Sequence, residues 1–280
     1  MDPSPANIEQ LRQRARRIRR LVIEMLAAAG SGHPGGSLSA ADIVTCLYFA
    51  VMRHRPDDPF WEDRDRFILS KGHACPVLYA ALAEAGYIAH DLLSSLRRFG
   101  SPLQGHPDRR KLRLMEASTG SLGLGLSMGI GLALAARLRG SPSRTYVLLG
   151  DGECEEGQIW EAAMYAPHVK LGNLCAIVDY NRLQLDASVA EITDLEPLAD
   201  KWRAFKWNTI EIDGHDYGQL LRAFGEAEQV QDRPTVIVAS TVKGKGVSYM
   251  ENQLKFHGSV PDKPEDIQRA LAEIEAEGSR

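Results

Sequence analysis

The sequence predicts an α/β fold in which helices cover both faces of a parallel sheet. Short apolar runs that suit buried strands alternate along the chain with segments that have the period of helices. The 280 residues, 44% of them hydrophobic, suffice to bury a substantial core, and no repeat or Gly/Ser-rich linker divides them. We therefore expect a single domain over residues 1–280, with a helical amino-terminal segment and a charged carboxy-terminal tail.

The first expected element is a helix that ends at Gly30. Apolar residues recur at steps of three and four from Ile8 to Ala29 and mark one face of this helix. Four arginines mark the other face, and we interpret it as a solvated surface rather than a membrane-binding or nucleic-acid-binding one. These arginines are Arg12, Arg16, Arg19 and Arg20.

Helices and strands are then expected to alternate. The predicted helices cover residues 39–52, 74–85, 121–138, 155–168, 197–205 and 216–228. The predicted strands cover residues 66–69, 145–149, 174–178, 207–212 and 234–240. In the charged segment 264–280, apolar residues at helical spacing indicate either a docked last helix or a frayed tail. In such a sheet, functional loops lie beyond the carboxyl ends of the strands.

Composition excludes several classes of partner. The net charge of −4 gives no polycationic surface, so nucleic acid is not an expected partner. The longest near-apolar run, residues 122–136, is too short to span a bilayer, so no membrane is expected either. The four cysteines lie far apart, and the amino terminus has no apolar stretch of the signal-peptide type. We expect reduced thiols and a cytoplasmic location.

Polar groups follow two of the predicted strands. Asp151, between two glycines in segment 150–153, follows one apolar run, and Asn181 follows another 30 residues later (181 minus 151). Their oxygens suit Mg²⁺, and a helix that begins at Glu153 would direct backbone N–H groups toward an anion. The pattern predicts a metal and diphosphate site on a loop that faces solvent. The alternative is that these two residues are a helix cap and a turn residue.

Four histidines are candidates for proton chemistry. They lie in loops flanked by Gly, Pro or Lys, where core packing gives no reason for an imidazole. An imidazole can donate, accept or shuttle protons near neutral pH. The candidates are His33, His73, His106 and His257. The other four histidines lack such surroundings, and we interpret them as structural: His54, His90, His168 and His215.

The motifs around these residues occur in the order found in transketolase. They are Ser31-Gly32-His33-Pro34-Gly35-Gly36, Ser70-Lys71-Gly72-His73-Ala74, Gln104-Gly105-His106-Pro107, Ser118-Thr119-Gly120-Ser121-Leu122-Gly123, Gly150-Asp151-Gly152 with Asn181, Lys243-Gly244-Lys245-Gly246-Val247 and Phe256-His257-Gly258. Over roughly residues 8–262 the chain resembles the amino-terminal third to half of that enzyme. The resemblance implies a thiamine-diphosphate-binding fold, with thiamine diphosphate and Mg²⁺ or another divalent cation as cofactors.

The resemblance also implies site residues. The metal ligands would be Asp151, Asn181 and the backbone carbonyl of Leu183. The four candidate histidines would be catalytic, with His73 also on the diphosphate and His106 on the first hydroxyl of the donor sugar. The residues implied in cofactor binding are His73, Gly120, Ser121, Leu122, Gly150, Gly152, Glu153, Asn181 and His257.

Some positions depart from the family pattern or stay open. The family usually has Pro where this chain has Ser121, and often has Gln where it has Leu124. The family's fine contacts to the aminopyrimidine ring of the cofactor are therefore not carried over to these two positions. Lys243 and Lys245 either contact a phosphate or cap the exit of a strand, and we favour a loop that closes over the cofactor. The departures at Ser121 and Leu124 do not remove a predicted metal ligand.

The resemblance implies that the chain transfers a two-carbon ketol unit from a ketose (phosphate) donor to an aldose acceptor. The chain ends where the second domain of a transketolase begins, so we expect a carboxy-terminal partner subunit that supplies the pyrimidine-binding half. Two copies of each chain would form a heterotetramer that acts on sugar phosphates, in the pentose phosphate pathway or in specialised sugar catabolism. The alternatives are a non-catalytic scaffold or regulatory subunit, and a nicotinamide-dependent dehydrogenase. The dehydrogenase interpretation uses the glycines in segment 123–129, but residues 109–117 do not form the apolar strand that it requires.

Overall fold

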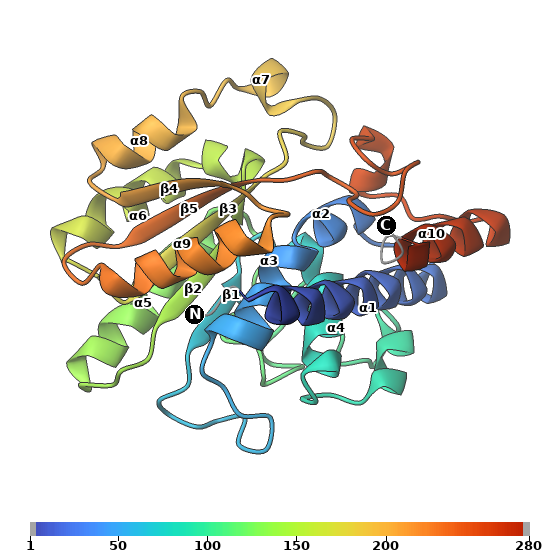
Figure 1. The fold of residues 1–280 in the computed structure, drawn as a ribbon, viewed down its shortest axis with the longest axis horizontal. Coiled ribbons are helices and arrows are strands. Elements are labelled where there is room, and N and C mark those ends of the chain that lie inside the picture. The colour runs from blue at the N-terminus through green and yellow to red at the C-terminus, as the bar shows by residue number, and fades with distance from the viewer. Residues whose placement is uncertain (1–3, 277–280) are drawn as a thin grey trace.

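The sheet at the centre of the molecule has parallel strands only. The computed structural model describes residues 4–276, and within them the strand order is β1-β2-β3-β5-β4. Every neighbouring pair is parallel, and helices lie on both faces, as Figure 1 shows. The α/β fold predicted from the sequence is therefore confirmed. The strands are β1 (Arg66–Leu69), β2 (Thr145–Gly150), β3 (Leu174–Tyr180), β4 (Asn208–Asp213) and β5 (Thr235–Ser240).

Helix α1 (Pro5–Ala29) has a clear signal at each end. The Ser4 hydroxyl accepts a hydrogen bond from the backbone N–H of Asn7, and Pro5 occupies the first turn. Gly30 adopts a left-handed φ of 65° and donates its N–H to the Leu26 carbonyl, so the predicted end of the helix is confirmed. The prediction that Arg19 is solvated is wrong, because its side chain is buried in an ion pair described below.

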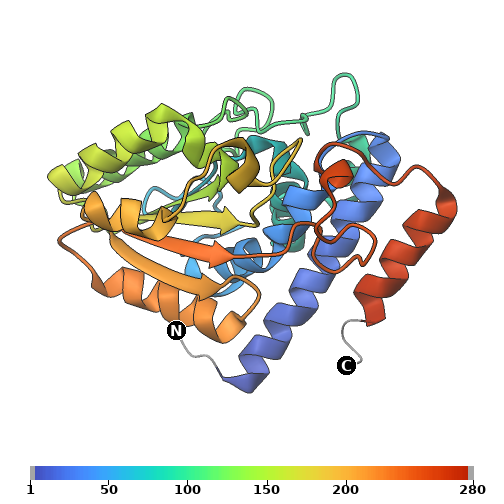
Figure 2. The same cartoon turned by 90° about the horizontal axis from the view of Figure 1, so that it is seen from above.

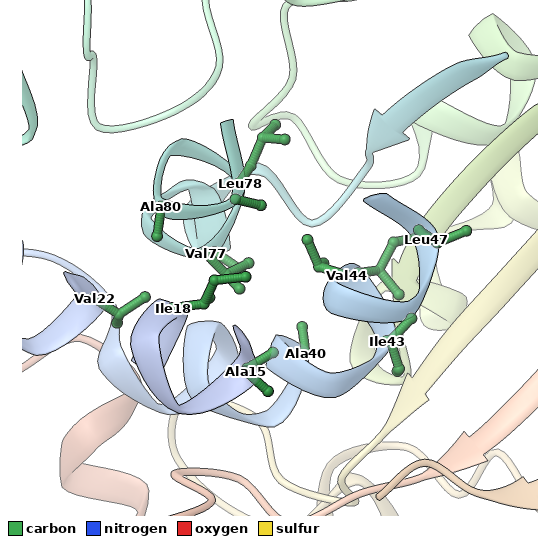
Figure 3. Packing of buried hydrophobic residues seen from close by; sticks show 14 of the residues in the cluster. Ala15, Ile18, Val22, Ala40, Ile43, Val44, Leu47, Val77, Leu78 and Ala80 are labelled. Carbon is green, nitrogen blue, oxygen red and sulfur yellow. The ribbon is translucent and has the colours of Figure 1, made fainter. Parts of the chain in front are cut away.

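One helical layer consists of α1, α3 (Ala41–Cys46), α4 (Cys75–Glu84) and α9 (Tyr217–Gln229). Figure 3 shows Ile18 and Val22 of α1 close to Val77 of α4, all of them fully buried. Burial of each such side chain contributes about 1.5–3 kcal/mol, so this contact fixes α1 against the rest of the layer.

Helix α10 (Pro264–Ala276) lies beside α1 in the views of Figures 1 and 2. Its Ala270 and Ile274 are buried in the same core. Of the two alternatives for the charged segment, the docked helix is therefore the correct one for residues 264–276. The last part of the expected tail, residues 277–280, lies outside the described residues.

The opposite layer consists of α5 (Leu124–Leu138), α6 (Gly157–His168) and α8 (Leu198–Ala204), with the short α7 (Val189–Ile192) nearby. Alternate residues of a strand point to opposite faces, so Val147 and Leu149 of β2 enter this layer while Tyr146 and Leu148 enter the other. Helix α5 lies very close to β2, because a Cβ built on Gly129 would be only 2.4 Å from Cγ2 of Val147.

Two predicted helices differ from the structure by more than two residues at one end or are divided. The helix expected over residues 39–52 is instead α2 (Pro34–Ser39), α3 and a π-helical turn, η1 (Leu47–Val51). The helix expected over residues 121–138 begins at Leu124, because Gly123 has a left-handed φ of 86°. The period of apolar residues does not reveal such local changes of backbone conformation.

The helix expected to begin at Glu153 does not begin there. Residues Gly152–Glu155 form a 3₁₀ turn, η4, and Glu156 is extended with φ −68° and ψ 126°, so that α6 begins at Gly157. Further 3₁₀ turns that were not predicted are η2 (Gly72–Ala74), η3 (His90–Ser95) and η5 (Leu254–His257). Among residues 4–276, no helix combines the length and the apolar character that a membrane crossing requires.

Candidate active site

Asp151 and Asn181 follow neighbouring strands at the carboxyl edge of the sheet. Gly150 of β2 lies opposite Asp179 of β3, so the two predicted residues leave the sheet at nearly the same level. The Asp151 carboxylate accepts hydrogen bonds from the backbone N–H groups of Gly152 and Arg182, the latter on the loop after β3. The structure therefore brings Asp151 and the Asn181 loop together, as the sequence predicted.

The loop of Asp151 does not face solvent, contrary to expectation. Its side chain is only 3% exposed, and that of Asn181 is buried as well. Burial and the nearby charge of Asp179 raise the pKa of Asp151 to about 6. The sequence did not reveal this burial, because the loop is covered by segments distant along the chain.

A buried ion pair between Lys71 and Asp179 lies next to the loop of Asn181. The ammonium group of Lys71 contacts the carboxylate of Asp179 and donates to the carbonyl of Gly36 at 2.8 Å. Asp179 also accepts hydrogen bonds from the hydroxyls of Ser39 and Thr241. Burial alone would raise the pKa of Asp179, but Lys71 and these donors hold it below its ordinary value.

This ion pair was not predicted from the sequence. Lys71 stands in the Ser70–Ala74 motif, and Asp179 ends an apolar strand. A charged residue at the end of a fully buried strand requires a counter-charge, and that signal was available in the sequence.

The four candidate histidines form one cluster. They come from four separate segments: the loop before α2, η2, the loop after η3, and η5. The ring centroid of His33 lies 5.2 Å from that of His73, 6.2 Å from that of His106 and 5.7 Å from that of His257. The rings of His73 and His257 are stacked at 5.2 Å. The structure therefore brings together every histidine that the sequence selected.

The surroundings of the histidine cluster favour neutral imidazoles. Burial, followed by the charge of Arg97, lowers the pKa of His33 to about 4. Burial and Lys243 lower the pKa of His257 to about 4, and burial also lowers the pKa of His73 and His106. At neutral pH each ring can therefore accept one hydrogen bond and donate another. Within the described residues, Nδ1 of His33 is buried without a hydrogen-bond partner.

Lys243 connects the histidine cluster with the loop after β3. Its ammonium group donates to the carbonyls of Leu183 and Gln184, both at 2.9 Å, and lies 2.8 Å from Nδ1 of His257. Burial lowers the pKa of Lys243 to about 8. The carbonyl oxygen of Leu183, a predicted metal ligand, thus already binds a cationic group.

The loop of Gly120, Ser121 and Leu122 lies against the histidine cluster. Gly120 has a φ of 136°, and a Cβ built there would be 3.0 Å from the ring of His106. The carboxylate of Glu153 accepts hydrogen bonds from Gly123 N–H at 2.9 Å and Gly150 N–H at 3.0 Å. The side chain of Glu153 therefore joins two loops of the site, whereas sequence analysis assigned a role only to its backbone.

The histidines that we interpreted as structural lie outside this cluster. Nδ1 of His215 lies 2.7 Å from Asp42, and its Nε2 accepts the N–H of Val242. Nδ1 of His54 lies 2.9 Å from the hydroxyl of Tyr87. The dehydrogenase alternative also fails structurally, because residues 109–117 contain turns and no strand.

The oxygen atoms near Asp151 suit a hard divalent cation. Within the described residues, no group of three or more His, Cys, Asp or Glu side chains is arranged to hold a metal. A metal here would use one carboxylate, from Asp151, with the neutral oxygens of Asn181 and Leu183. Mg²⁺ is commonly bound by one or two protein carboxylates, with phosphate and water oxygens completing the shell, so this set fits Mg²⁺ with a diphosphate.

Comparisons with known proteins place the chain in a family. Residues 11–275 match the family model described as transketolase, thiamine diphosphate binding domain. The chain is 45% identical over 269 residues to the 6-deoxy-6-sulfo-D-fructose transketolase subunit SqwG of Clostridium sp. (strain MSTE9), covering 96% of this chain and 98% of that protein. It is 41% identical to one of the subunits of the apulose-4-phosphate transketolase of Phocaeicola vulgatus, covering 95% of this chain and 94% of that protein.

Solved structures agree with the sequence comparison. The transketolase of Leishmania mexicana superposes with a TM-score of 0.88 at 36% identity, covering 96% of this chain and 41% of that one. A Pichia stipitis transketolase variant superposes with a TM-score of 0.89 at 35% identity, covering 94% of this chain and 40% of that one. The chain thus spans about two fifths of the length of these solved transketolases. From the family match and this likeness, we conclude that the chain belongs to the transketolase family, in which it corresponds to the thiamine-diphosphate-binding domain.

Proposed function

We propose that the chain is the amino-terminal subunit of a two-chain transketolase, which transfers a two-carbon ketol unit from a ketose to an aldose. One observation carries this proposal. Four neutral histidines form a cluster at the same edge of the sheet as the oxygen atoms of Asp151, Asn181 and Leu183. Two relatives that match over almost their full length are themselves named as transketolase subunits, which supports the two-chain arrangement.

The cofactor in this proposal is thiamine diphosphate held through Mg²⁺. Asp151, Asn181 and the carbonyl of Leu183 would bind the metal, and His73 with the backbone of Gly152 and Glu153 would hold the diphosphate. The remaining cofactor contacts would come from Gly120, Ser121, Leu122, Gly150 and His257. When bound, thiamine diphosphate supplies the electron sink that cleavage between carbons 2 and 3 of a ketose requires.

The histidines in this proposal handle protons and hydroxyl groups of the substrate. His33 and His257, both neutral at pH 7, can accept a hydrogen bond from a sugar hydroxyl or take up its proton. His106, whose ring lies beside that of His33, would bind the first hydroxyl of the donor. Because the rings are close together, one sugar chain can contact several of them at once.

The partner in this proposal is a separate carboxy-terminal subunit that supplies the pyrimidine-binding half, with two copies of each chain in a cytoplasmic enzyme. The substrates would be sugar phosphates or sulfonated sugars, since the two named relatives are described by apulose 4-phosphate and 6-deoxy-6-sulfo-D-fructose. These names differ although both proteins resemble this chain to a similar degree, so the partner subunit would decide between substrates.

Reconstitution tests the proposal. The purified chain alone should show negligible ketol transfer, and addition of the proposed carboxy-terminal subunit should restore transfer from a ketose phosphate to an aldose phosphate. High activity of the isolated chain would contradict the two-chain arrangement. Full cofactor binding by the complex without any turnover would instead indicate a scaffold or regulatory subunit.

Substitution of Asp151 by Ala tests the metal assignment separately. The variant should lose Mg²⁺-dependent binding of thiamine diphosphate, measured by calorimetry on the complex, while its circular dichroism spectrum stays that of the native chain. Unchanged cofactor affinity would remove Asp151 from the metal site.

A further inference from the structure

Arg97 is anchored at the base of the loop that carries His106. It follows η3, adopts a left-handed φ of 61°, and donates its backbone N–H to the carbonyl of Leu103 at 2.9 Å. The hydroxyls of Ser95 and Ser101 lie 2.7 Å apart and close the same loop. A non-glycine residue rarely adopts this backbone conformation, so the position of Arg97 is fixed by the loop rather than by local preference.

The side chain of Arg97 lies against two glycines of the site. A Cβ built on Gly105 would be 2.7 Å from Nε and 2.9 Å from Nη2 of Arg97, so a side chain at position 105 would displace the guanidinium from this place. A Cβ built on Gly32 would be 3.6 Å from Nη1. Gly105 precedes His106 and Gly32 precedes His33. The guanidinium therefore lies between the two backbone segments that carry these histidines.

The charge of Arg97 acts on the same two histidines. Among the residues that the structure describes, its guanidinium forms no ion pair or side-chain hydrogen bond, so no carboxylate neutralises it directly. After burial, Arg97 is the largest cause of the lowered pKa of His33, and it is the charged group that lowers the pKa of His106. Geometry and charge thus point to the same pair of rings.

We propose that Arg97 is a positioning residue of the site, whose guanidinium packs against the two glycine segments that carry His33 and His106 and presents its positive charge to both imidazoles. The link to catalysis rests on the proposed transketolase function, whereas the effect on the two rings does not depend on it. Neutral rings accept hydrogen bonds from sugar hydroxyls, and protonated rings cannot. Arg97 would therefore allow the enzyme to stay active at lower pH, although it does not itself contact the substrate.

The other groups that face His33 do not offset the charge of Arg97. They are His73, His106, His257 and Lys243, and none of these residues carries a negative charge. Among these surroundings Arg97 contributes a permanent charge, because a guanidinium does not titrate in the accessible pH range. Its removal should therefore make protonation of His33 and His106 easier.

Titration of the histidines by NMR tests the charge effect without any need for activity. The full chain with ¹³C-labelled histidines would be compared with R97Q, R97K and the matched control R98Q. Arg97 and Arg98 are both exposed, and Arg97 is the one whose guanidinium lies against Gly105 and Gly32. Substitution of each histidine in turn assigns its signal. R97Q should raise the pKa of His33 and His106 by about 0.5 unit or more, whereas R97K and R98Q should leave both nearly unchanged. Equal titration curves in R97Q and R98Q would overturn the proposal.

The pH dependence of turnover by the two-chain complex tests the consequence for catalysis. R97Q should move the acidic limb of the kcat/KM profile to higher pH by a similar amount, with R97K restoring most of the native profile. A loss of activity that is equal at every pH and equal in R97Q and R97K would show a purely structural role and overturn the proposal. If the native complex lacks ketol transfer although R97Q shifts both titrations, the proposed function fails while the effect of Arg97 on the rings stands.

Discussion

The ammonium group of Lys243 lies 2.9 Å from the backbone carbonyl oxygen of Leu183. In the proposed site this oxygen is a ligand of Mg²⁺. A divalent cation and an ammonium group repel one another, so metal binding requires the ammonium to leave this oxygen. The diphosphate that accompanies the metal would then offer it a negatively charged partner.

Lys243 is therefore predicted to couple cofactor binding to proton uptake above pH 8. In the ligand-free chain burial lowers the pKa of Lys243 from its ordinary value of 10.5 to about 8, so at pH 8.5 most of the population is uncharged. A neighbouring diphosphate favours the charged form, and binding should take up a proton. Calorimetry at pH 8.5 in buffers with different ionisation enthalpies measures this uptake. K243M should abolish it and the matched control K245M should retain it; uptake that persists in K243M would contradict the prediction.

Replacement of Asp151 by Asn is predicted to stabilise the ligand-free chain at pH 8. The pKa of Asp151 is about 6 in the folded chain and about 3.9 in an unfolded one, so its charge destabilises the fold above pH 6. The penalty decreases as the pH falls and disappears below about pH 4, where both states are protonated. Unfolding in urea should show D151N more stable by about 1–3 kcal/mol at pH 8, with no such gain at pH 4. A variant that is less stable at pH 8 would contradict this assignment.

The buried carboxylate of Asp42 is predicted to be essential for stability. It accepts hydrogen bonds from Arg19 at 3.0 and 2.6 Å, contacts the hydroxyl of Tyr217 and lies 2.7 Å from His215. Its removal leaves the buried guanidinium of Arg19 without this counter-charge, which typically costs about 3–5 kcal/mol. D42A should lose stability of that order in urea unfolding. The control D232A breaks the exposed ion pair with Arg233 and should cause no measurable change.

Two glycines of α5 are predicted to respond differently to substitution by Ala. A Cβ on Gly125 would lie 2.2 Å from Oγ and 2.8 Å from Cα of Ser70, whereas a Cβ on Gly131 would meet no atom within 4 Å. G125A should therefore displace the loop that carries Lys71 and His73, with lower stability and lower turnover of the complex. G131A should stabilise the chain by about 0.5–1 kcal/mol through helix propensity alone. Similar thermal midpoints for the two variants would contradict the contact between α5 and this loop.

The sequence predicted much of the fold because buried parallel strands are continuous apolar runs. The strand over residues 174–178 and the helix that ends at Gly30 were both recognised from local patterns. The helix expected over residues 39–52 was not, because its apolar spacing continues across the boundary near Ala40 and the π-helical turn. The spacing of apolar residues shows which residues are buried. It does not show the backbone hydrogen-bond pattern, which distinguishes an α-helix from a π-helical turn.

The candidate site was partly predictable for a related reason. Imidazoles in glycine-rich loops are chemically conspicuous, and all four selected histidines lie in one cluster. The Lys71–Asp179 ion pair and the position of Arg97 depend on segments far apart in the chain. The sequence signals that Asp179 needs a counter-charge, but the identity of its partner appears only when the fold brings those segments together. The same holds for the surroundings of Arg97 and for the burial of Asp151.

The histidine cluster draws its rings from positions 33, 73, 106 and 257, so it assembles only after nearly the whole chain has folded. Its geometry is consequently a product of tertiary packing and not of any local segment. A proteolytic cut or an insertion anywhere between the first and last of these positions endangers the cluster, even where the sheet itself survives.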